Sequence, residues 1–103
     1  MKKLEVNNII KSSEILPMMK QFEYFKGKHP NYLILLRCGD FYKTYNMDAK
    51  ECATILGIAM TWCNNIFPRN HAYDGAIVEF PQSMLDIYLP KLIRAGKKVA
   101  VCD

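Results

Sequence analysis

The sequence predicts an α+β domain: a mixed β-sheet of about five strands with three packed helices. Segments with helical periodicity alternate with segments of strand-forming residues, and two of the strands follow each other directly across a short turn. A hairpin inside such an alternation is not compatible with a purely parallel sheet. The length of 103 residues fits one domain. We expect a polar tail at residues 1–15 and the domain itself at residues 16–103.

The first helix is predicted over residues 17–28. Pro17 suits its first turn, because a backbone N–H at that position would have no partner within the helix. Met18, Phe22 and Phe25 recur at i, i+4 and i+7, so they share one face. A Gly-Lys-His-Pro run then ends the helix.

The next two elements are predicted to be strands joined in a hairpin. Residues 32–36 read Tyr-Leu-Ile-Leu-Leu and are apolar on both faces, which is typical of an interior strand. Cys-Gly-Asp at residues 38–40 supplies turn chemistry. Residues 41–45 read Phe-Tyr-Lys-Thr-Tyr, a composition that favours a strand.

A second helix is predicted over residues 48–56, with Asp48 at its N-terminus, where a carboxylate is favoured by the helix dipole. Its buried face is predicted to consist of Ala49, Cys52, Ala53 and Leu56. Gly57 ends this helix. We expect a short strand at residues 58–62 and a polar loop at residues 63–73.

A further strand is predicted at residues 75–80, where Pro81 ends it. Ser83 is expected to cap a third helix that runs to about residue 95. The buried stripe of that helix is predicted to consist of Leu85, Tyr88, Leu89 and Leu92. Pro90 lies inside the pattern, and we expect it to kink or shorten the helix.

Gly96 is predicted to cap the C-terminal end of the third helix. A last strand is expected at residues 99–102, which brings the sheet to about five strands. The chain stops directly after this strand, which indicates either a truncated polypeptide or a domain that normally continues.

The formal net charge of +4 permits an anionic partner but is weak support for one by itself. The cysteines are Cys38, Cys52, Cys63 and Cys102. No two of them form a CxxC pair, so the sequence predicts no zinc site and no cofactor. With neither a secretory signal nor a long apolar run, we expect a reduced, cytoplasmic protein without a membrane partner.

The residues do not predict an enzyme, and no catalytic residue is expected. His29 and His71 are isolated and are interpreted as solvated surface residues. Three acidic residues are close in sequence, but a metal cluster is not the best explanation for them. Asp40 suits a turn, Asp48 a helix N-terminus and Glu51 the first turn of that helix. There is no GxxxxGK[ST] run for a P-loop and no serine nucleophile elbow.

The segment Phe41-Tyr42-Lys43 is a candidate for nucleic-acid binding. Neighbours on a strand point to opposite faces, so one aromatic ring can enter the core while the other projects outward. A projecting ring beside an ammonium group suits stacking on bases with a phosphate contact. From spacing alone, an aromatic pair at a sheet edge with a solvated Lys43 is the favoured interpretation. A basic cluster (Lys91, Arg94, Lys97 and Lys98) is explained by helix-dipole compensation, with a secondary phosphate contact as the alternative.

Several spaced segments, in order, carry a resemblance to a known family. They are Leu-Pro-Met-Met-Lys-Gln-Phe at 16–22, Lys-His-Pro at 28–30, Leu-Arg-Cys-Gly-Asp-Phe-Tyr at 36–42, Asp-Ala-Lys at 48–50, Leu-Gly-Ile at 56–58, and residues 88–103 throughout. Together they make residues 16–103 resemble domain I, the mismatch-recognition domain of MutS proteins. The resemblance implies a mixed α/β unit whose phenylalanine inserts from the minor groove and stacks on a mispaired base. Phe41 occupies the position of that phenylalanine.

Lys43 departs from the family pattern, because it stands where the resemblance implies a glutamate that hydrogen-bonds the mispaired base. A carboxylate accepts hydrogen bonds, whereas an ammonium group only donates them. We therefore expect Lys43 to raise general DNA affinity and to weaken mismatch discrimination.

Two other segments also differ from the family. Thr-Trp-Cys at residues 61–63 replaces a Thr-Lys-Arg that is frequent in the family. The loop that follows looks a few residues longer than in the family. It contains Asn64, Asn65 and Arg69, whose side chains could reach the groove. The family's Gly-Ile-Pro-Tyr-His becomes Glu-Phe-Pro-Gln-Ser at residues 79–83. These 103 residues contain no later MutS domain, so we expect no ATP hydrolysis from them.

The expected DNA-binding residues are Phe41, Lys43, Tyr42, Arg69 and Asn64. The expected partners are double-stranded DNA, including mismatched DNA, and other mismatch-repair domains or proteins. The alternative is a protein-interaction module that keeps the fold without reading DNA. A small nuclease-like enzyme is the third hypothesis, and the lack of a plausible acid–base pair argues against it.

Overall fold

The computed structural model describes residues 17–63 and 70–103, and the expected tail at residues 1–15 lies outside them. The described elements are a helix at residues 17–28, β1 (Tyr32–Cys38), β2 (Phe41–Tyr45), α2 (Asn46–Leu56), β3 (Thr61–Trp62), β4 (Ala76–Pro81), the short 3₁₀-helix η1 (Gln82–Met84), α3 (Leu85–Arg94) and β5 (Lys98–Cys102). The predicted α+β class, with five strands and three packed helices, is confirmed.

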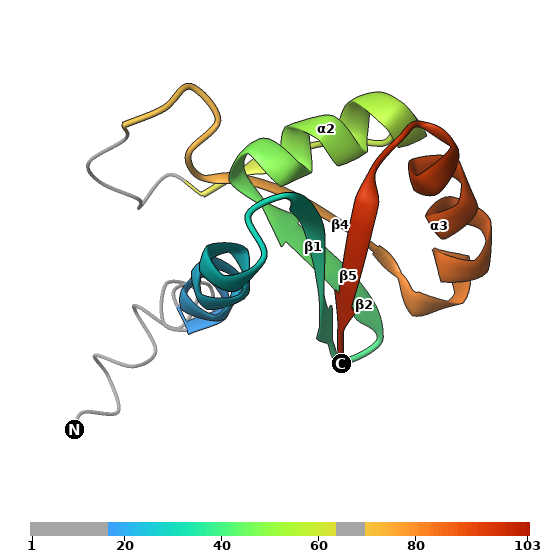
Figure 1. The fold of residues 1–103 in the computed structure, drawn as a ribbon, viewed down its shortest axis with the longest axis horizontal. Helices are drawn as coiled ribbons and strands as arrows, with labels where there is room; N and C mark the ends of the chain where they lie inside the picture. Colours follow the sequence, from blue (N-terminus) through green and yellow to red (C-terminus); the bar gives the residue numbers. More distant parts are fainter. Residues whose placement is uncertain (1–16, 64–69) are drawn as a thin grey trace.

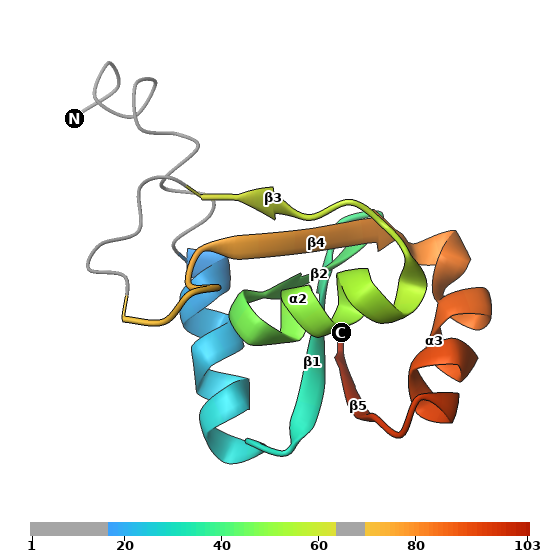
Figure 2. The same cartoon turned by 90° about the horizontal axis from the view of Figure 1, so that it is seen from above.

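The five strands form one mixed sheet in the order β3-β4-β2-β1-β5. The pairs β1–β2, β2–β4 and β3–β4 are antiparallel, whereas β5 runs parallel to β1. The sheet is strongly twisted, and β4 crosses the direction of β1 in the view of Figure 2. The helix at residues 17–28 lies on one side of the sheet, and α2 and α3 lie on the other (Figure 1).

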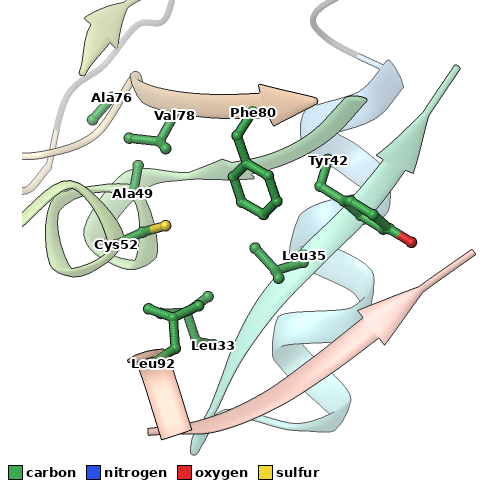
Figure 3. Packing of buried hydrophobic residues seen from close by; sticks show 9 residues of the cluster. All are labelled: Leu33, Leu35, Tyr42, Ala49, Cys52, Ala76, Val78, Phe80 and Leu92. Atoms are coloured by element: carbon green, nitrogen blue, oxygen red, sulfur yellow. The ribbon is translucent and has the colours of Figure 1, made fainter. Parts of the chain in front are cut away.

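The interior strand β1 is buried on both faces, as its sequence predicts. Leu33 and Leu35 pack with α2, β4 and Leu92 of α3 in the larger core cluster (Figure 3). Ile34 and Leu36 pack on the opposite side, against Phe22 of the first helix. Since alternate residues of a strand point to opposite faces, a continuous apolar run can serve two cores at once.

Glycines end both later helices, as expected. Gly57 follows α2 with a left-handed φ of 69°, and its N–H donates to the Ala53 carbonyl at 2.8 Å. After α3, Gly96 adopts a φ of 89°. The Gly96 and Lys97 N–H groups donate to the carbonyls of Ile93 (2.9 Å) and Leu92 (3.1 Å), which is a Schellman motif.

The prediction that Ser83 caps the third helix is wrong. Ser83 is exposed inside η1, and neither η1 nor α3 has a side-chain cap hydrogen bond. The chain enters α3 through this 3₁₀ turn, which satisfies backbone groups without a side chain. Pro90 remains inside α3, where its missing N–H leaves the helix one hydrogen bond short but does not end it.

Several boundaries differ from the predicted ones, including those of α2 and β3. The second helix begins at Asn46 rather than Asp48, and Asn46 itself has a left-handed φ of 56°, which asparagine tolerates. The Asn46 Oδ1 also accepts the Gly75 N–H at 2.9 Å, which ties this bend to the start of β4. The strand expected at residues 58–62 is shortened to β3, which pairs with β4 at two positions only.

Thr44 suggests a stabilising substitution. It is fully buried in β2, and within the described residues its Oγ1 has no hydrogen-bond partner. A buried unpaired hydroxyl costs free energy, so Thr44→Val is expected to raise the free energy of unfolding by about 1 kcal/mol. A urea or thermal melt would measure the gain, and a less stable variant would show that this hydroxyl has a partner.

Within residues 17–63 and 70–103, no helix has both the length and the apolar character that crossing a bilayer requires.

Candidate nucleic-acid interface

Phe41 is held in the sheet by its backbone but remains accessible through its side chain. It is the first residue of β2, paired with Cys38 of β1 on one side and with Pro81 of β4 on the other. Its side chain is 40% exposed and belongs to neither of the two buried clusters of the described chain. A large aromatic ring in this position is available to a partner.

The turn before Phe41 is braced by two hydrogen bonds. Gly39 adopts a φ of 61°, and the Arg37 Nε donates to its carbonyl oxygen at 2.7 Å. On the other side, the Gln82 N–H donates to the Asp40 carbonyl oxygen at 2.8 Å. The backbone of Phe41 is therefore fixed by two neighbouring strands and by a tied turn, which limits the ordering cost when a ligand binds.

Tyr42 points away from Phe41, into the larger core cluster. Its side chain is 4% exposed and packs near Phe80 and Leu35 (Figure 3). Its hydroxyl donates to the Asp103 Oδ1 at 3.0 Å, and burial together with this carboxylate raises the pKa of Tyr42. The ring of Tyr42 thus fills the core on the face of β2 opposite Phe41, and a role for Tyr42 in DNA binding stays a prediction.

Lys43 lies on the same side of the sheet as Phe41, since the two are separated by two positions on one strand. Its register partner on β4 is Glu79. The Lys43 Nζ lies 3.5 Å from the Glu79 Oε1, with the two side chains 27% and 51% exposed. The positive charge beside Phe41 is thus partly compensated by a carboxylate on the neighbouring strand.

Sequence reasoning did not include Glu79 in the site. One signal was available: Glu79 is the only charged residue of β4, and it interrupts an otherwise apolar strand. What the sequence does not reveal is that β4 pairs with β2 in a register that places Glu79 opposite Lys43. Such a pairing joins segments far apart in the chain and depends on the whole sheet.

The other two predicted site residues belong to the segment that follows β3. Asn64 and Arg69 lie outside the described residues. Trp62, which stands in the segment that differs from the family, pairs with Ala76 at the far end of β4 from Pro81. There its ring stacks on Tyr73 at a centroid distance of 6.1 Å.

The basic cluster near α3 does not form a surface with Phe41. Lys97 pairs with Glu51 of α2, with 3.1 Å between Nζ and Oε1. Lys91 and Arg94 occupy the last turn of α3, where cations compensate the helix dipole. These groups belong to the α2–α3 side of the sheet, which is consistent with a solvated, structural role.

The described residues also contain no group of three histidine, cysteine or acidic side chains placed to hold a metal ion. Cys52 of α2 is fully buried in the larger core cluster, and this burial raises the pKa of its thiol to about 12. A thiol with such a pKa is a poor nucleophile at neutral pH. Cys52 thus serves the core.

A family model described as MutS domain I matches residues 16–103. The chain belongs to the MutS domain I family. It is 51% identical over 89 residues to the DNA mismatch repair protein MutS of Phocaeicola vulgatus, a match that covers 86% of this chain. It is 54% identical over 86 residues to the DNA mismatch repair protein MutS of Bacteroides fragilis, covering 84% of this chain. Each match covers 10% of the relative, so this MutS domain I chain spans about a tenth of the length of these MutS proteins.

Proposed function

We propose that this chain binds double-stranded DNA and inserts Phe41 into the minor groove at mispaired or easily deformed sites. The observation that carries the proposal is the exposed ring of Phe41 on a backbone fixed by β1, β4 and a braced turn. An apolar wedge partly unstacks a base step and kinks the duplex. That kink costs less where base pairing is already defective.

Lys43 supports DNA binding through charge. Its ammonium group lies on the Phe41 side of the sheet and can donate to phosphate or to base acceptors. It cannot accept a hydrogen bond from a base N–H, so we propose that Lys43 raises general affinity and weakens mismatch discrimination. Other mismatch-repair domains or proteins are proposed as partners, because the similar MutS proteins are about ten times as long as the match.

We expect weak and salt-sensitive binding, because Glu79 partly compensates the charge of Lys43, the cation that shares the face of β2 with Phe41. With two to four phosphate contacts, the plot of log K against log salt should have a slope of about −2 to −4. Fluorescence anisotropy with labelled matched and mismatched duplexes at several salt concentrations measures both slope and preference. The absence of binding to every duplex at low salt would refute DNA binding, and a strong mismatch preference would refute the role assigned to Lys43.

The second candidate is a protein-interaction module. The observation that favours it is the mixed charge around Phe41, where Asp40 and Glu79 accompany Lys43. Aromatic residues are enriched in protein interfaces, where polar groups form the rim around them. The same anisotropy titration separates the two functions, because a protein-interaction module gives no salt-dependent DNA binding.

A further inference from the structure

The two borders of the sheet differ in how well they are protected against pairing with another strand. β3 forms one border and β5 the other (Figure 2). β3 is only two residues long, and a short edge strand is a common protection. β5 has five residues, all paired with β1 in unbroken register, and contains neither a bulge nor a proline. Among the described residues, no strand pairs with the outer side of β5, so its outer backbone groups can pair with a further strand.

The side chains of β5 also favour pairing. Val99 and Val101 are register partners of β1 residues in the larger core cluster, so both valines lie on the α2–α3 side of the sheet. Val101 is nevertheless 37% exposed. The only charged residue within the strand is Lys98, at its start. A charge in the middle of an edge strand is a natural protection against pairing, and β5 has none there.

We infer that β5 pairs antiparallel with β5 of a second copy of this chain, around a two-fold axis at Ala100. An axis perpendicular to the sheet makes opposed residues share a face, so each residue opposes one an even number of positions away. Val99 then opposes Val101 of the second copy, and Lys97 opposes its Asp103. Apolar and oppositely charged cross-strand pairs both stabilise a sheet. An axis at Val99 or at Val101 would instead set a valine opposite Lys97 or Asp103.

The charged groups at the two ends of this pairing keep capacity for another partner. Lys97 and Glu51 form an ion pair at 3.1 Å, with the two side chains 32% and 30% exposed. The Asp103 Oδ1 accepts the Tyr42 hydroxyl. An ammonium group has three donors and a carboxylate has further acceptor positions, so both can form the additional pair. Because a two-fold axis uses the β5 edges of both copies, the assembly closes as a dimer.

The test measures the oligomeric state of the full chain, without DNA, by sedimentation velocity from about 1 μM to about 1 mM protein, the affinity range of small interfaces. Val101→Lys places a charge on the face that the valines share. Met47→Lys is the matched control, because Met47 is also an exposed apolar residue, at 50%, but belongs to α2. Asp103→Lys sets like charges opposite each other, and adding Lys97→Asp restores opposite charges. Melting curves verify that each variant is folded.

We expect the unsubstituted chain and Met47→Lys to form the same concentration-dependent dimer and no larger species. Val101→Lys should weaken this dimer by at least about tenfold, and Asp103→Lys by roughly two- to thirtyfold, since each dimer contains two such pairs. The double variant should recover most of the loss. A monomer at every concentration, a dimer that Val101→Lys weakens no more than Met47→Lys does, or a folded double variant as weak as Asp103→Lys would overturn the inference. None of these results depends on DNA binding by Phe41.

Discussion

Phe41→Ala is expected to weaken DNA binding roughly five- to 150-fold at fixed salt, because stacking of one base on an aromatic ring contributes about 1–3 kcal/mol. The ring is exposed and lies outside both buried clusters, so its loss should leave the melting temperature nearly unchanged. Anisotropy titrations on matched and mismatched duplexes measure the effect. The salt slope should stay constant, since no phosphate contact is removed.

Tyr24→Ala is a suitable control for this experiment. Tyr24 is another exposed aromatic residue, at 57%, but it belongs to the helix at residues 17–28 rather than to the sheet. Its removal should leave DNA affinity unchanged. If both variants bind as the unsubstituted chain does, Phe41 has no wedge role; if both weaken equally, binding depends on general aromatic surface rather than on Phe41.

Asp48→Ala is expected to have the largest effect on stability. Asp48 is 3% exposed, and its Oδ2 accepts the Ile34 N–H of β1 at 3.0 Å while its Oδ1 lies 2.9 Å from the Lys26 Nζ. This carboxylate therefore connects α2, β1 and the first helix. Removal leaves a buried backbone donor unpaired and should lower the free energy of unfolding by about 2–4 kcal/mol. The melting temperature should fall by on the order of 10–20 °C.

Asp86→Ala is the matched control, because Asp86 also lies in the first turn of a helix but is exposed. It should change stability by less than about 0.5 kcal/mol. An equally small effect of Asp48→Ala would show that the connection through Asp48 is dispensable.

Asp48→Asn separates charge from hydrogen bonding. Burial raises the pKa of Asp48 above its ordinary 3.8, although Lys26 and the Ile34 N–H act in the opposite direction. As the pH rises from about 3.8 through the raised pKa, the unfolded chain releases this proton before the folded chain does. Ionising Asp48 therefore lowers stability as the pH rises across that window, while its hydrogen bonds with Lys26 and the Ile34 N–H persist above it. Urea melts of Asp48→Asn should lack this slope, and an identical pH profile for both proteins would contradict the assignment.

Local patterns were sufficient to predict most of the fold. The continuous apolar run of β1 and the hairpin turn after it identified the centre of the sheet, and Gly57 and Gly96 marked helix ends. These signals depend on neighbouring residues only. The prediction that Ser83 caps the third helix was wrong because the same residues can begin a helix in two ways, with a side-chain cap or through a 3₁₀ turn.

The candidate site was less predictable. Strand alternation indicated that one of Phe41 and Tyr42 enters the core, and the structure assigns that place to Tyr42. Glu79 was missed because its approach to Lys43 depends on a strand pairing between distant segments. The connection of Asp48 to Lys26 and Ile34 depends in the same way on the packing of three elements, and its sequence position suggested only a helix N-terminus.

The parallel pairing of β1 with β5 has a consequence for folding and handling. Among the described residues, β5 is the strand that pairs with β1 on the side away from β2, and the two strands are far apart in the sequence. Until β5 docks, a partly unfolded molecule presents the bare edge of β1 along its apolar run at residues 32–36, and such an edge is a template for aggregation. Loss of the interaction between Ile34 and Ala100, or of any part of this pairing, should therefore appear first as poor solubility on expression and only later as a change in DNA binding.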